Sequence, residues 1–453
     1  MSPTDTIVSW IEETRQRPLP AAVEDQVRRL LRDYLACVVA GSDSSIARTV
    51  RSWLAETDFG DRALVVGGGR ASAAGAAFAN GTSAHCLELD DGYTKGSVHP
   101  SAVVVSAALA AGQSHAAPPA SVQMAIALGT EVTCRVAEAG HPATRRQGFH
   151  NTAIAGVIGA AVGAGVAMGL SSEQLRQAIA LATSFSGGLF AFLQNGADVK
   201  RIHPGKAARD GVVCAELAAK GLTGPKEPLV GPDGYFPAFA TSGWSTGPLD
   251  ALASPTHEWA MLETYFKRHA SCRHVHSAVD AALQLRDDIE GSHNAIESVV
   301  VETYRVATLH DGLELETELG AQLSMPYSLS VALVAGGSGP EFFSSEWRQQ
   351  PDVLRIAKLV EVRVGEHEDE AYPDARPATV TVTTGNSEHS LTVLNPAGEP
   401  ANPMSDDQLR MKFMELATPT LGSGGAAEVS DAVDTLDLER IYSLLESEAP
   451  IRP

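Results

Sequence analysis

Apolar residues recur at every third or fourth position over much of the first half of the chain. Between Val23 and Val38 they line one face of an amphipathic helix. The same spacing predicts helices over residues 72–87, 101–113, 121–138, 152–170, 172–185 and 205–220, joined by short connections that contain Gly or Pro. A succession of helices with little strict alternation is typical of an all-α domain.

The pattern changes after about Lys267. Strands are predicted over residues 296–304, 360–364 and 379–384, and helices over 275–287, 321–335 and 352–357. Between Thr379 and Thr383 threonine alternates with valine, which predicts a sheet with one covered face. We therefore expect an α+β domain over about 268–400.

The end of the chain turns helical again after Pro403. Helices are predicted over residues 405–417 and 430–445, with a Gly-rich loop at 422–425 between them. Periodicity leaves open whether these helices pack on the first domain. At 453 residues the chain exceeds what one ordinary core organises, so two domains are expected.

One helical segment, residues 153–170, carries no charge over 18 positions, near the lower limit for crossing a bilayer. Eleven of these residues are Ala or Gly, which transfer weakly to lipid, and no basic flank accompanies them. We interpret the segment as a buried helix whose small side chains permit close packing. The first ten residues lack the basic start and apolar run of a signal peptide, so a cytoplasmic protein without a membrane partner is expected.

The formal charge of -21 repels nucleic acid and anionic membrane surfaces, so neither is expected as a partner. It also serves solubility. If the substrate is itself an anion, a local cluster of basic side chains has to overcome the long-range repulsion from this negative charge. The five cysteines are scattered without paired spacing, which predicts buried thiols rather than disulfides or a zinc site.

The densest polar segment covers residues 84–100 and contains His85, Glu88, Asp90, Asp91 and His99. Buried together, such groups can supply a general acid and a general base, because like charges and desolvation separate the pKa values of neighbours. A solvated helix end followed by a loop is the alternative. His99 precedes a proline, which favours extended backbone there.

Two further segments combine basic residues with a predicted helix start. His150 directly precedes the small-residue helix, whose free N–H groups favour a carboxylate, although capping or packing would also explain it. Residues 200–209 form the most basic run, in which Lys200, His203 and Lys206 are spaced by three. A helix is expected to begin near Gly205, and a basic surface loop is the alternative to an anion-binding pocket.

The fourth segment, residues 267–276, lies at the predicted domain junction, where ligands often bind. It contains Lys267, His274 and His276, but no carboxylate or cysteine pattern of recognised spacing, so a metal is not expected. The chain also lacks the glycine-rich dinucleotide fingerprint, the phosphate-binding loop and the nucleophile elbow. No cofactor is expected.

In their order and separation these segments resemble the signature segments of the MmgE/PrpD family. The resemblance covers nearly the whole chain. It runs through residues 79–81, 84–85, 90–91, 99–100, 148–150, 152, 200–205, 207–208, 221–225, 231, 234–236 and 324–327, with Lys267, Cys272 and His276.

The resemblance implies a mainly α fold. It places a large helical domain over residues 1–267 and 401–453, a smaller α+β lid over 268–400, and a cofactor-free and metal-free site between them in a homodimer. Carried over residue by residue, it assigns catalysis to Asp90, Asp91, His99, His150, Lys200 and Tyr304, and substrate binding to Lys206, Lys267, His276 and Tyr327. His99 and His150 are the acid/base candidates, and Lys200 and Lys267 would hold carboxylates.

The implied activity is proton abstraction next to a carboxylate of a small anionic di- or tricarboxylate. Fixed ammonium and imidazolium donors would stabilise the charge that develops on that carboxylate. A dehydratase-type lyase is the first expectation. Many family members read Asp-Phe-Asp-Asp-Thr where this chain has Glu88-Leu89-Asp90-Asp91-Gly92, which keeps an epimerase of the iminodisuccinate type open. A decarboxylase of the cis-aconitate type is less favoured, and a catalytically silent scaffold is the alternative outside the enzymes.

Overall fold

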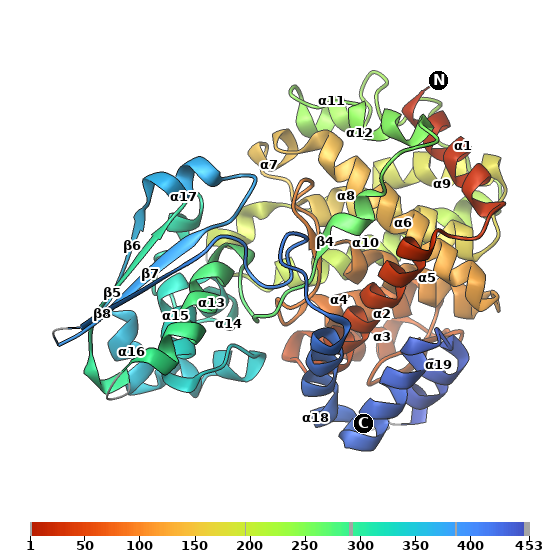
Figure 1. Ribbon diagram of the computed structural model, residues 1–453. Coiled ribbons are helices and arrows are strands. Elements are labelled where there is room, and N and C mark those ends of the chain that lie inside the picture. Colours follow the sequence, from red (N-terminus) through yellow and green to blue (C-terminus); the bar gives the residue numbers. More distant parts are fainter. Residues whose placement is uncertain (1, 195, 290–292, 386, 448–453) are drawn as a thin grey trace.

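A computed structural model describes residues 2–194, 196–289, 293–385 and 387–447. Figure 1 shows a large helical body beside a smaller lobe built on a sheet. The mainly α fold expected from the sequence is confirmed. The body contains α1 (Pro3–Arg15), α2 (Ala21–Gly41), α3 (Ser45–Thr57), α4 (Ala73–His85), α5 (Pro100–Ser114), α6 (Pro119–Gly140), α7 (Ala143–Arg146), α8 (Asn151–Ala167), α9 (Ser172–Phe185), α10 (Val199–Ala219), α11 (Tyr235–Ala240) and α12 (Gly247–Asp250).

The uncharged helix α8 lies at the centre of the body, where it packs against α5, α6, α9 and α10. All of its residues are buried. A Cβ atom on Gly159 would lie 1.7 Å from the side-chain oxygen of Thr133 on α6, so this approach requires glycine. Among the described residues, no helix is long and apolar enough to cross a membrane. The small residues of this segment therefore serve helix packing.

The smaller lobe contains a four-stranded mixed sheet in the order β6-β5-β7-β8. Strand β5 pairs parallel with β6 and antiparallel with β7, which pairs antiparallel with β8. Valines of β5 and β7 face a core formed with α13, α15 and α16, while the alternating threonines of β7 are more exposed. The elements are α13 (His276–Leu285), β5 (Ile296–Thr303), α14 (Glu318–Leu323), α15 (Met325–Ala335), α16 (Pro351–Ala357), β6 (Val360–Val364), α17 (Glu366–Ala371), β7 (Ala378–Thr384) and β8 (Ser387–Val393).

The last helices return to the body. Helices α18 (Asp406–Asp434) and α19 (Leu438–Ser447) pack together, and α18 lies against α2 (Figure 1). The segment that joins the sheet lobe to α18 runs beside the chain that enters the lobe, where the Phe266 N–H donates to Gly398 O at 3.0 Å. The division at residues 268 and 400 stays a prediction.

Several predicted elements differ from the structure. The helix that carries Lys200 begins at Val199, not near Gly205. Pro204 is tolerated because it lies near the helix start, where its missing N–H leaves only the Lys200 carbonyl without its usual donor. Lys200 and His203 therefore lie on the first turns of α10 instead of in a loop.

Other differences concern breaks between helices. The predicted helix over 321–335 is divided at Ser324, whose extended backbone ends α14 and whose hydroxyl accepts from the Tyr327 N–H of α15. The predicted Gly-rich loop at 422–425 is shortened to Gly422, whose φ of 69° and ψ of 165° are not helical and divide α18 into two helical segments across a kink. The predicted helix over 430–445 is likewise divided between α18 and α19.

Candidate active site

A short strand pair connects the first and fourth polar segments. Strand β3 (Gly92–Tyr93) pairs antiparallel with β4 (Thr264–Tyr265), with Gly92 opposite Tyr265. A Cβ atom on Gly92 would lie 2.3 Å from the Tyr265 hydroxyl oxygen, so glycine is required for this contact. The carboxylates before β3 and Lys267 after β4 are thereby brought to the same place. The only other pair in the body, β1 (Ala63–Val65) with β2 (Gly69–Ala71), contains none of the predicted site residues, as far as the described chain extends.

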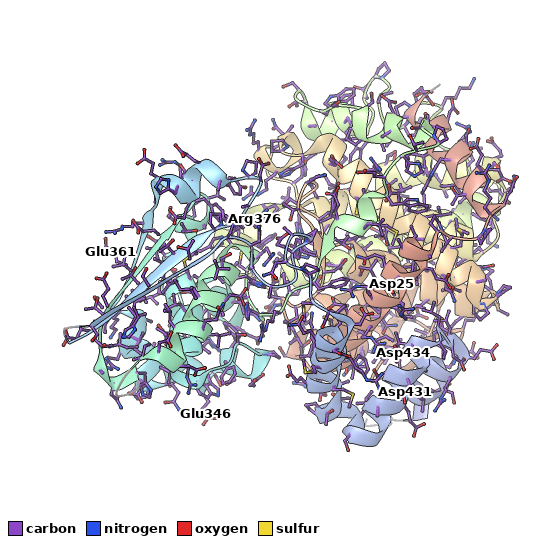
Figure 2. The ribbon with its side chains drawn as sticks, viewed as in Figure 1. Asp25, Glu346, Glu361, Arg376, Asp431 and Asp434 are labelled. Carbon is purple, nitrogen blue, oxygen red and sulfur yellow. The ribbon has the colours of Figure 1, made fainter. Side chains whose placement is uncertain are left out.

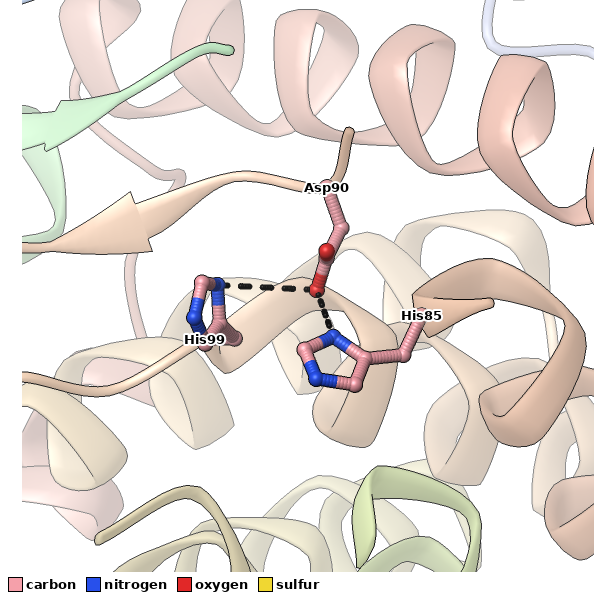
Figure 3. Close-up of side chains that lie close together, drawn as sticks. All are labelled: His85, Asp90 and His99. Atoms are coloured by element: carbon pink, nitrogen blue, oxygen red, sulfur yellow. Dashed lines mark hydrogen bonds and ion pairs between the residues drawn. The ribbon is translucent and has the colours of Figure 1, made fainter. Parts of the chain in front are cut away.

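Asp90 is shared by two histidines (Figure 3). His85 Nδ1 lies 2.7 Å from Asp90 Oδ2, and His99 Nδ1 lies 3.6 Å from the same oxygen. His85 is the last residue of α4, and His99 is the N-cap of α5, with the extended backbone that its position before Pro100 predicts. Burial opposes ionisation of Asp90, yet His85 and His99 outweigh it and lower the pKa of Asp90. Asp90 is therefore a buried carboxylate anion.

The hydrogen bonds of His99 fix its tautomer. Its Nδ1 lies 2.7 Å from the backbone oxygen of Asp91, which can only accept, so Nδ1 carries the proton and Nε2 keeps its lone pair. Its backbone N–H donates to Thr152 Oγ1 of α8 at 3.1 Å. Burial, together with Lys267, His85 and Lys200, outweighs Asp90 and lowers the pKa of His99 to about 3. His99 is thus a neutral imidazole, and hydrogen bonds hold both its ring and its backbone N–H.

Asp91 has a different environment from Asp90. Its carboxylate accepts from the Ser101 N–H at 3.1 Å, while burial and the nearby Asp33 and Asp90 raise its pKa well above the usual range. Burial and these two carboxylates therefore favour the protonated form of Asp91. Lys412 of α18 donates to Asp33 Oδ1 at 2.5 Å and to Leu89 O at 2.7 Å. Helix α18 is thereby joined to the segment that carries Asp90 and Asp91.

Glu88 lies between the two predicted carboxylate-binding lysines. Lys200 Nζ donates to Glu88 Oε1, and Lys267 Nζ lies 3.4 Å from Glu88 Oε2. All three side chains are less than one-tenth exposed. Burial opposes ionisation of Glu88, but the two ammonium groups outweigh it and hold its pKa well below the usual range. Glu88 also has φ 55°, a left-handed conformation that costs energy in a residue with a Cβ atom and is often found at functional sites.

His150, the N-cap residue of α8, completes this cluster. Its Nδ1 lies 2.9 Å from His203 Nδ1 of α10, so one ring donates and the other accepts. Its ring centroid is 6.5 Å from that of His85, and Phe190 and Phe192 cover it at 5.0 and 5.5 Å. Burial, with neighbouring positive groups, lowers the pKa of His150 well below the usual range and that of His203 to about 4. Both are neutral.

The remaining predicted residues lie outside this cluster. Tyr304 follows β5, and its hydroxyl lies 2.7 Å from His274 Nδ1 in the sheet lobe. Lys206 contacts Phe185 O and Asp210, and the Tyr327 hydroxyl donates to Phe342 O. His276 is buried, with Nε2 at 3.1 Å from Ser271 O.

The structure thus brings together six of the predicted residues and adds three others. Predicted Asp90, Asp91, His99, His150, Lys200 and Lys267 are joined by His85, Glu88 and His203. All three stand in the polar segments of the sequence, but nothing in the sequence identifies Glu88 as the partner of two lysines 112 and 179 residues away.

A metal ion has a geometrically possible site here. The nearest donor atoms of His85, Asp90 and His99 all lie within 4.8 Å of one another. Binding through His99 Nδ1 would require that atom to lose its proton and to release Asp91 O. Positive charge on Lys267, which acts on Asp90, opposes a further cation. The expectation of a metal-free site stays a prediction.

Comparison with known protein families gives matches over both parts of the chain. The family model of the MmgE/PrpD N-terminal domain matches residues 5–246, and that of the MmgE/PrpD C-terminal domain matches residues 269–438. The chain therefore belongs to the MmgE/PrpD family, as its motifs suggest.

Its curated relatives include fungal and animal proteins. The cis-aconitate decarboxylase-like protein oryM of Aspergillus oryzae is 25% identical over 98% of this chain and 97% of its own length. The cis-aconitate decarboxylase of Aspergillus terreus is 25% identical over 98% of this chain and 95% of its own. The human cis-aconitate decarboxylase is 26% identical over 83% of this chain and 80% of its own. Family and relatives support an enzyme of the lyase type.

Proposed function

We propose that this protein is a cofactor-independent lyase that acts on a small di- or tricarboxylate by moving a proton at the carbon next to a carboxylate. One observation carries the proposal: a neutral imidazole, His99, with its lone pair on Nε2, lies in a buried cluster with two ammonium groups. Neutral imidazole is the form that accepts a proton, and ammonium groups stabilise the charge that appears on a substrate carboxylate.

Lys200 and Lys267 are the groups that receive the substrate carboxylate. Both contact one carboxylate, that of Glu88, so the three groups carry a net positive charge. A substrate carboxylate that joins them adds negative charge close to His99. Added negative charge raises the pKa of a neighbouring imidazole, which makes His99 a stronger base when substrate is bound.

His150 is the proposed proton donor or acceptor on a second side of the substrate. It comes from a different helix than His99, and His203 holds its Nδ1. In a dehydratase, one group removes the α-proton while another protonates the departing hydroxyl. Roles for Tyr304, His276, Lys206 and Tyr327 are proposed from the family resemblance alone, because their hydrogen bonds lead to residues outside the cluster.

An experiment in D₂O distinguishes the family's reactions. The enzyme is incubated with citrate, aconitate and iminodisuccinate, and products are followed by NMR and mass spectrometry. A dehydratase forms a double bond and loses water, and its reverse reaction introduces deuterium at the α-carbon. An epimerase exchanges the α-proton and scrambles the stereocentre with no loss of atoms, whereas a decarboxylase releases CO₂. If the whole panel shows neither exchange nor turnover, the proposed substrate class is wrong.

We also propose a homodimer. Four exposed apolar side chains, Phe185, Leu189, Leu193 and Val199, lie within one segment beside the site helices. Exposed apolar side chains grouped in this way favour a protein interface. Sedimentation of the purified chain should give twice the monomer mass of 47.5 kDa, and a monomer at all concentrations would contradict the proposal.

A further inference from the structure

A cysteine and a histidine meet in the sheet lobe, outside the proposed site. Cys272 Sγ lies 3.7 Å from His310 Nε2. Cys272 caps the 3-10 turn Arg273–Val275, and His310 ends the 3-10 turn Ala307–His310. Both side chains are partly exposed, whereas Cys37, Cys86, Cys134 and Cys214 are buried. Cys272 is therefore the thiol within reach of a reagent among the five.

A third group orients the histidine. His310 Nδ1 lies 2.9 Å from the backbone oxygen of Leu323, which can only accept. The Nδ1 atom therefore carries the proton, and the lone pair of Nε2 faces the Cys272 thiol. A nucleophile beside a base that is itself held by a third group is the arrangement that activates cysteine in enzymes.

The surroundings favour the ionised form of the pair. Burial opposes ionisation of Cys272, but His310, the backbone N–H of His274 and the charge of Lys267 outweigh it and lower the pKa of the thiol to about 7. Burial likewise opposes protonation of His310, but Cys272, the Leu323 carbonyl and Asp311 raise its pKa. The ring of His274 stacks on His310 at 5.4 Å.

Two arginine side chains lie near His274, whose ring stacks on His310. Arg376 Nη1 lies 3.3 Å from His274 Nδ1, and Figure 2 shows Arg376 where the sheet lobe faces the helical body. Arg273 pairs with Glu399 through Nε and Nη2, and its buried Nη1 has no partner within the described residues. Within the part of the chain that the structure describes, Arg273 and Arg376 share a single carboxylate, that of Glu399, so positive charge remains for an anion.

We propose that Cys272 and His310 form a nucleophilic thiolate–imidazolium pair, a covalent modification site for small carboxylates that carry an electrophilic carbon. The proposal does not depend on His99 or on the proposed reaction. With a haloacetate, the thiolate forms the S–C bond, the halide leaves with the C–halogen bonding electrons, and the proton stays on His310. The carboxylate of the reagent is attracted by Arg273, whose Nη1 has no partner within the described residues, and by Arg376 beside His274.

Alkylation of the full chain tests the pair. Wild-type protein is treated with iodoacetate or iodoacetamide over a series of pH values, and the labelled peptides are quantified by mass spectrometry. We expect Cys272 to be labelled first, with a half-maximal rate near pH 7 instead of the value of about 8.5 for an ordinary cysteine. Relative to free cysteine, iodoacetate should gain at least several-fold over neutral iodoacetamide.

Variants test whether the reactivity of Cys272 depends on His310 or only on the exposure of the thiol. Cys272→Ala should abolish the fast label, and His310→Gln should move its half-maximal pH upward to about 8.5 or higher. His367→Gln, at an exposed histidine of α17 in the same lobe, should leave the profile unchanged. A wild-type midpoint at or above that of free cysteine overturns the proposal, even if His310→Gln does not fold. Preference for iodoacetamide overturns the anionic specificity.

Discussion

Glu88 Oε2 lies 3.4 Å from Lys267 Nζ, and its other carboxylate oxygen binds Lys200. A carboxylate of the protein itself therefore lies between the two groups proposed to bind the carboxylate of the substrate. A bound substrate has to share these lysines with Glu88 or displace it.

Removing the charge of Glu88 should strengthen substrate binding. In Glu88→Gln both ammonium groups lose their anionic partner, so a polycarboxylate experiences a more positive site. At the effective dielectric of a protein interior, the change is worth roughly 1–2 kcal/mol, or about a ten-fold lower KM. Steady-state kinetics measure it, with Glu361→Gln at an exposed position of β6 as the charge-matched control (Figure 2). A loss of kcat at constant KM would instead show that Glu88 takes part in the proton transfer.

His99→Gln should remove the general base and leave the fold intact. Glutamine cannot accept the proton, so kcat should fall by about 10²–10⁴-fold, the usual contribution of general base catalysis. His115→Gln is the matched control, because His115 caps the other end of the same helix α5 and is exposed. Circular dichroism confirms folding. If both variants keep wild-type kcat, His99 is not the base.

The sequence predicted the helical body well because its signal is local. The 3.6-residue spacing from Val23 and the uncharged run that became α8 depend only on neighbouring residues. The sequence missed β8, whose alternating pattern starts from polar Ser387 and whose side chains are half-buried or exposed. It also misplaced the start of α10, which begins at Val199 instead of near Gly205. Helix α10 can include Pro204, because a proline this close to the helix start removes only one hydrogen bond.

For the site, too, the sequence predicts local features but not long-range contacts. Family motifs named His99, His150, Lys200 and Lys267 from local strings of residues, and the fold brings them together. The position of Glu88 between two lysines depends on the β3–β4 pairing and on the packing of α10 beside α4, which are long-range contacts. Likewise, Asp90 and Asp91 are neighbours whose pKa values shift in opposite directions, because His85 contacts Asp90, while burial, Asp33 and Asp90 act on Asp91.

The buried pair of Lys412 and Asp33 should be essential for stability. Lys412→Met leaves the Asp33 carboxylate buried without its ammonium partner, which should cost about 3–5 kcal/mol in the free energy of unfolding. The double variant Asp33→Asn/Lys412→Met should recover much of that loss, because no uncompensated charge remains. Urea unfolding measures both. Arg440→Met, which breaks the exposed ion pair with Glu428, should cost less than about 1 kcal/mol. Equal losses in Lys412→Met and Arg440→Met would contradict the buried-pair argument.

The buried neutral histidines should make the fold sensitive to weak acid. His99 and His203 have folded-state pKa values of about 3 and about 4, below the value of about 6.5 in the unfolded chain. At pH values between the folded and the unfolded pKa of a histidine, the unfolded chain binds more protons than the folded chain. The free energy of unfolding therefore decreases as the pH falls below about 6.5. Each such histidine should contribute about 1 kcal/mol of loss between pH 7 and roughly pH 5.5. Urea unfolding of wild type and His203→Gln at both pH values measures the effect, and the variant should lose less stability on acidification than the wild type. An equal loss in the two proteins would mean that His203 is already protonated in the folded chain at neutral pH, or that it titrates as freely as in the unfolded chain.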